Sequence, residues 1–109
     1  MDNNLRYIQK QIDKSRAEAV AAQRLAVAER SQADGYVAEH EQGERDRHLI
    51  QAERYDQEAD QHEAEAQALE PKKAQLEARV IELKAERDAI NRQVLDRTVA
   101  IDRELAEIQ

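Results

Sequence analysis

Large apolar residues in the last third of the chain recur at alternating spacings of four and three residues. Leucine or isoleucine recurs every seven residues at one seam position, and β-branched residues recur at the other. This combination is typical of a two-stranded coiled coil. The pattern therefore predicts a helical heptad segment over residues 76–108. Its seam consists of Leu76, Val80, Leu83, Arg87, Ile90, Val94, Arg97, Ile101, Leu105 and Ile108.

A second row with the same rhythm crosses the first third of the chain, but its members become small. Large residues at positions 5, 8 and 12 give way to Ala19, Ala26 and Ala33. Small side chains let two helix backbones approach closely. This row therefore predicts an alanine-lined contact with another helix.

The middle of the chain carries a matching row, because extending the C-terminal heptad backward puts alanines at one seam position. An antiparallel hairpin then sets small residues beside small ones and large residues beside large ones. Heptad helices can also pair when shifted by seven residues, and this match of sizes favours the unshifted register. Its expected contacts are Ala33 with Ala52, Ala26 with Ala59, Ala19 with Ala66, and Leu5 and Ile8 with Leu76 and Val80. The residues predicted to pack within the chain are Leu5, Ile8, Ile12, Ala19, Ala26, Ala33, Ala52, Ala59 and Ala66.

These rows define an all-α fold: an elongated antiparallel hairpin with an overhanging C-terminal coiled coil. The expected elements are a helix over 2–41, a turn over 42–44, and a helix over 45–109 with a kink near Pro71. The alternative is a three-helix bundle with breaks near Pro71 and Gly35, where glycine would take the left-handed conformation of a helix cap. The heptad phase runs through Pro71 unbroken, whereas it changes between the two glycines, so the main turn is expected there.

The composition favours helices that pair along their length rather than a compact globular core. Of the apolar residues, 19 are alanine, and the chain has three tyrosines but no phenylalanine or tryptophan. Such a chain has few of the bulky side chains that fill a globular core. We therefore expect stability to come from helices that pair along their length, and we expect a homodimer.

Charge is concentrated in the middle third. Residues 38–70 hold eleven acids and three bases, whereas residues 1–37 and 71–109 are close to neutral. Placing the alanines on the inner seam turns the carboxylates outward, so the middle is expected to display an acidic surface. Its residues are Glu53, Asp56, Glu58, Asp60, Glu63 and Glu65. A pI near 5.0 argues against nucleic acid as a ligand, because that binding needs clustered Lys and Arg.

The chain offers little catalytic or metal-binding chemistry. It has no cysteine, no glycine-rich phosphate loop and no nucleophile beside a base. His40, Glu44 and His48 are spaced by four, as are Glu58 and His62, but neither set has a further ligand or supporting partner in the sequence. We expect these side chains to be solvated, with no catalytic residues, no metal and no cofactor.

The expected function is therefore recognition by surface. The leading hypothesis is a non-enzymatic coiled-coil scaffold that self-associates through residues 76–108 and presents its acidic helix to another protein. The alternative is an acidic inhibitor that imitates a nucleic-acid backbone in a basic groove, and a histidine-based switch ranks last. With no apolar leader or membrane-length segment in the sequence, we expect a soluble cytoplasmic protein without membrane, nucleic-acid or small-molecule partners.

Overall fold

The computed structural model describes residues 4–109, and within them the chain forms long α-helices and no strand. α1 spans Leu5–Asp34, a short 3-10 helix η1 spans Glu39–Glu41, and α2 spans Gln42–Ile108. The prediction of an all-α helical hairpin is confirmed. The expected start of the first helix at residue 2 lies outside the described residues.

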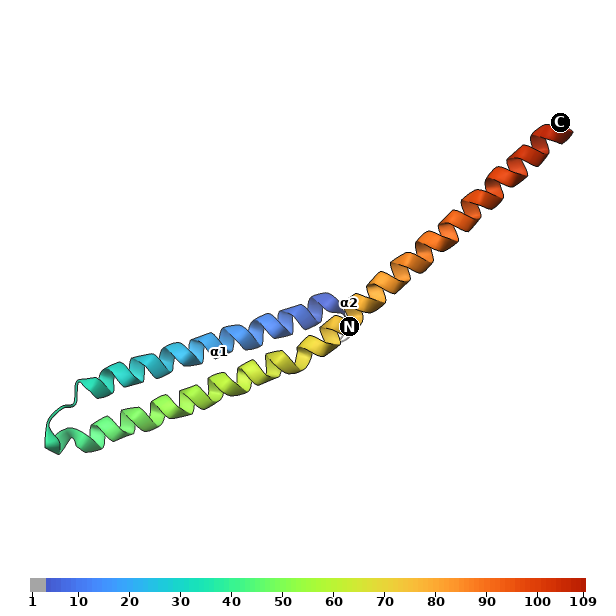
Figure 1. The fold of residues 1–109 in the computed structure, drawn as a ribbon. Helices are drawn as coiled ribbons and strands as arrows, with labels where there is room; N and C mark the ends of the chain where they lie inside the picture. Colours follow the sequence, from blue (N-terminus) through green and yellow to red (C-terminus); the bar gives the residue numbers. More distant parts are fainter. Residues whose placement is uncertain (1–3) are drawn as a thin grey trace. The chain divides into compact units, whose positions relative to one another are not determined.

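The chain divides into two compact units. The first, which we call the hairpin unit, ends at Lys73, and the second, the C-terminal segment, runs from Ala74 to Gln109. In the hairpin unit, α1 and the first part of α2 lie side by side and antiparallel (Figure 1). The alternative of three helices is not observed, because α2 is helical through Pro71. Proline has no backbone N–H to donate to the carbonyl of residue 67, so the helix lacks one backbone hydrogen bond there.

α1 begins with a side-chain cap. The Asn4 side-chain oxygen accepts hydrogen bonds from the backbone N–H of Arg6 at 2.7 Å and of Tyr7 at 3.4 Å. The first N–H groups of a helix have no partner within the helix, so a polar residue in this place stabilises the first turn.

The connection lies at residues 35–41 and not at the expected 42–44. α1 ends at Asp34, and the N–H of Gly35 donates to the carbonyl of Gln32 at 3.1 Å. Gly35 has φ −75° and ψ −14°, so it is right-handed and not in the expected left-handed cap conformation. Gly43, which was expected to lie in the turn over 42–44, lies instead in the first turn of α2.

Helix α2 is started by η1. The carbonyl of Ala38 accepts from the N–H of Glu41 at 2.9 Å, while the Glu41 carboxylate accepts from the N–H of Ala38 at 3.3 Å. The two reciprocal bonds close one turn in front of Gln42. This turn has no apolar periodicity, which explains why the heptad pattern did not locate it.

Small side chains fill the interface of the hairpin unit. Alanine accounts for most of its buried residues, and the two largest fully buried side chains, Ile8 and Ile12, belong to the first turns of α1. The remaining buried residues are Ser15, Ala19, Ala22, Ala26, Ala33, Ala52, Ala59 and Ala66. Because alanine adds little bulk, the helix backbones can pack at the short end of the usual range of helix separations.

The pairing differs in detail from the expected one. Ala59 forms a cluster with Ala19 and Ala22 of α1, whereas the expected neighbour of Ala59 was Ala26. Ala22 and Ala19 precede Ala26 in α1 by four and seven residues. The expected register paired each residue with one residue of equal size on the facing helix. In the structure, Ala59 packs against two residues of the facing helix instead of one, as in knobs-into-holes packing. The expected contact of Leu5 and Ile8 with Leu76 and Val80 would join the two units and stays a prediction.

Enlarging a buried alanine should destabilise the hairpin unit. Ala59→Leu inserts three carbons into a site that is 3% exposed, and we expect a loss of about 1–3 kcal/mol in the free energy of unfolding. Ala64→Leu on the exposed side of the same helix is the matched control, with an expected change within about 0.5 kcal/mol. Urea unfolding followed by circular dichroism measures both, and equal effects would contradict the alanine interface.

Replacing Gly43 should stabilise the start of α2. No heavy atom lies within 4 Å of a Cβ built on Gly43, so Gly43→Ala should add about 0.4–1 kcal/mol by restricting the unfolded chain. At Gly35 the added Cβ would lie 3.4 Å from the carbonyl oxygen of Gln32, so Gly35→Ala should gain less. Thermal melting compares the two, and a loss at Gly43 would contradict a helix that begins at Gln42.

Candidate functional site

The seam of the C-terminal segment is open to solvent. Leu76 is half-buried, and every residue from Glu77 to Gln109 is exposed. Exposure of the large apolar seam residues ranges from 37% at Val80 to 79% at Ile108. An exposed row of large apolar residues of this length is typical of an interaction surface, whereas isolated exposed apolar residues are ordinary.

On a straight helix, the apolar row differs from the heptad seam at one position. At 3.6 residues per turn, residues 18 apart point in the same direction. Leu76 and Val94 therefore share one direction, and Thr98 takes the direction of Val80. The straight apolar row consists of Leu76, Val80, Leu83, Arg87, Ile90, Val94, Thr98, Ile101, Leu105 and Ile108.

On a straight helix Arg97 lies at the edge of this row, and its expected place on the seam of a supercoiled pair stays a prediction. Arg97 is 18 residues from Arg79 and so occupies the same flank. Thr98 lies within the row on a straight helix, and its hydroxyl donates to the backbone carbonyl of Val94 at 2.8 Å. The hydroxyl is thus satisfied within its own helix, and its methyl group can join the row. Arg87 stays on the row, where its guanidinium contacts Asp88 at 3.3 Å.

A second apolar row was missed from the sequence. Ile81, Leu95 and Val99 are exposed on the C-terminal segment and lie at least 100° around the helix from the centre of the seam. Ile81 and Val99 are again 18 residues apart. A search for seven-residue repeats does not detect apolar residues spaced 18 apart. Plotting the sequence on a straight helix would have detected them.

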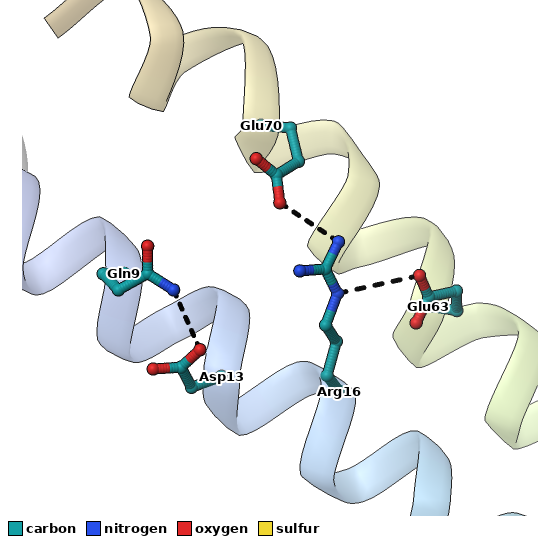
Figure 2. A network of polar contacts seen from close by, with 5 residues as sticks. All are labelled: Gln9, Asp13, Arg16, Glu63 and Glu70. Atoms are coloured by element: carbon teal, nitrogen blue, oxygen red, sulfur yellow. Dashed lines mark hydrogen bonds and ion pairs between the residues drawn. The ribbon is translucent and has the colours of Figure 1, made fainter. Parts of the chain in front are cut away.

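Arginines of α1 reach the acidic surface of α2. Figure 2 shows Arg16 between two carboxylates of α2, with its nitrogens 3.8 Å from an oxygen of Glu63 and 3.0 Å from one of Glu70. Arg30 pairs with Asp56 in the same way. The Gln9 amide donates to Asp13 at 2.9 Å within α1 and does not cross the interface.

The expected acidic surface is therefore divided. Asp56 and Glu63 are half-buried and have arginine partners, and Glu65 lies 3.3 Å from His62. The other three expected residues, Glu53, Glu58 and Asp60, are exposed on α2. Sequence reasoning gave the outward direction of these carboxylates but not the arginines that α1 brings to them.

Two histidines join the helices of the hairpin unit. His48 Nδ1 lies 2.6 Å from a carboxylate oxygen of Glu29, and both side chains are only 22–23% exposed. The ring of Tyr36 stacks on His48 with centroids 5.5 Å apart and planes 15° apart. His62 Nδ1 lies 3.2 Å from Glu18 of α1. These contacts hold the two helices together beside the alanine interface.

The spacing of His40, Glu44 and His48 does not produce a metal site. His40 lies in η1, before α2 begins, so the three residues do not share one helical face. Within residues 4–109, no three His, Asp or Glu side chains are grouped closely enough to hold a metal ion.

A hollow at the start of α1 is lined by Asn4, Arg6, Tyr7 and Lys10, all of which are exposed. No helix among residues 4–109 has a stretch both long and apolar enough to cross a membrane.

Comparison with protein-family models, curated proteins and solved structures gives no match. The structure itself defines the class: an all-α helical hairpin of coiled-coil type. Its candidate functional surfaces are the apolar seam of the C-terminal segment and the acidic side of α2.

Removing His48 should loosen the hairpin unit near its connection. His48→Ala deletes both the contact with Glu29 and the ring stack with Tyr36, and we expect a loss of about 1–2 kcal/mol in the free energy of unfolding. His40→Ala, at an exposed position, is the control and should change it by less than about 0.5 kcal/mol. Chemical unfolding measures both variants, and a His48 variant as stable as the control would show that these contacts contribute nothing.

Proposed function

We propose that this protein is a non-enzymatic coiled-coil scaffold that self-associates through residues 76–108. The observation that carries the proposal is the exposed seam of the C-terminal segment, where eight large apolar residues line one side of a helix. Full burial of one such side chain is worth about 1.5–3 kcal/mol. A few of them per chain are enough to offset the roughly 4–15 kcal/mol that association costs.

The second part of the proposal is that the acidic side of α2 faces a different partner protein. Glu53, Glu58 and Asp60 are exposed on α2 and close in sequence. Exposed charge of one sign raises association rates and selects basic partners more than it adds affinity. We place the protein in the cytoplasm as part of the same proposal, since a chain without cysteine needs no oxidising compartment.

Imitation of a nucleic-acid backbone is the weaker proposal. It needs a continuous row of free negative charge, but Arg16 and Arg30 of α1 pair with Glu63, Glu70 and Asp56. These pairs divide the acidic row into shorter groups. A scaffold that displays a few carboxylates has no such requirement.

Charges on the seam should abolish self-association. The double change Leu83→Asp and Ile90→Asp places two carboxylates on the apolar row, and we expect the dissociation constant to rise at least 100-fold because buried unpaired charge is costly. Ala78→Asp with Ala89→Asp adds the same charge on the opposite side of the helix and is the control. Sedimentation velocity gives the masses, and a seam variant that keeps the mass of the unaltered protein would refute the proposal.

A further inference from the structure

The flanks of the seam carry a charge pattern that distinguishes the two possible orientations of a pair. On one flank, the exposed residues Arg79, Glu86, Arg97 and Glu104 alternate in sign. The 18-residue repeat explains the alternation, because Arg97 falls in line with Arg79 and Glu104 in line with Glu86. A residue at a given distance from one end of this flank therefore has the opposite charge to the residue at the same distance from the other end.

The other flank reverses its sign between its two halves. Lys84 lies in the first half and Asp102, 18 residues later, in the second. Glu77, near the start of this flank, has its counterpart at the end of the chain, where Gln109 is neutral. Both flanks are therefore complementary to their own reversed copies.

In an antiparallel pair related by a two-fold axis, each flank faces the same flank of the second copy. Arg79 then lies near Glu104 of the second copy, Glu86 near Arg97, and Lys84 near Asp102. Symmetry doubles each contact, so the pair has six oppositely charged contacts. On the seam, Arg87 falls near Thr98 or Ile101 of the second copy, while Val80 falls near Leu105 or Ile108.

A parallel pair in register gives a poorer match. The flanks that face each other are then the two different ones, and Arg79 approaches Lys84 of the second copy. Arg87 also meets Arg87 of the second copy in one layer of the seam. Of the close flank contacts, only Arg97 with Asp102 joins opposite charges.

We propose that the occupant of the seam is a second copy of this chain in antiparallel orientation, with the two helices crossing between Ile90 and Val94. This inference rests on the self-association proposed above and adds its direction. The overlap of residues 76–108 with their counterpart stays within the C-terminal segment of each copy.

Charge exchange tests the orientation. A half-exchanged variant, Arg79→Glu with Lys84→Glu, puts like charges at four of the six antiparallel contacts, and we expect dimerisation to weaken at least tenfold at low salt. Adding Asp102→Lys and Glu104→Arg to the same chain restores opposite signs and should restore the affinity. A parallel pair predicts the reverse, since the half exchange keeps like charge between residues 79 and 84, and the full exchange repels residue 97 from residue 102.

The outcomes are distinct for the two proposals. If the unaltered protein is monomeric, self-association itself fails. If it dimerises and the full exchange is weaker than the half exchange, or the two are equal, self-association stands and the antiparallel orientation is overturned. Sedimentation equilibrium at low and high salt separates the cases, because the effect of surface charge shrinks with ionic strength.

Cysteine cross-linking gives a second, independent measurement, because the natural chain has no cysteine. Single variants Ile90→Cys and Val94→Cys lie at the crossing, so at least one should oxidise to a disulfide-linked dimer. Ile108→Cys should not, because the two thiols of an antiparallel pair would lie roughly 40 Å or more apart at 1.5 Å per residue. Efficient linkage through residue 108, or a mass above that of a dimer, would overturn the proposal.

Discussion

The close approach of two alanine-lined helix faces is the constraint on which the hairpin unit depends. Ala19, Ala22 and Ala59 meet at its centre, and none of them can fill a wide gap. The helices must therefore lie close together along most of α1. Each alanine contributes little apolar area, so the interface gains its stability from length, and Ile8 and Ile12 supply bulk only at one end.

The polar contacts follow from this close approach. With a narrow interface, side chains at its edges reach the facing helix, and Arg16, Arg30, His48 and His62 all contact carboxylates across it. Exposed pairs of this kind contribute little stability individually. Their larger effect is on register and on surface charge, since they select one alignment of α1 on α2 and neutralise part of the acidic row.

Much of the fold could be predicted from periodicity alone. The four-three rhythm and the scarcity of breakers gave two helices in a hairpin, and the change in residue size along each row indicated which faces meet. The connection at residues 35–41 could not be found this way, because η1 depends on two local hydrogen bonds of Ala38 and Glu41. The cross-helix partners of the histidines also required the helices to be placed in space. The 18-residue spacing of Arg79 and Arg97, in contrast, follows from helix geometry and could have been found from the sequence.

The C-terminal segment has the opposite character, since its large apolar side chains are exposed and its charges flank them in a self-complementary order. In the proposed dimer, a second copy of the chain covers this exposed seam in solution. The mass of the full chain by sedimentation equilibrium tests this claim most directly. We expect a concentration-dependent rise to twice the chain mass of 12.5 kDa, and a mass of 12.5 kDa that persists at high concentration would contradict self-association.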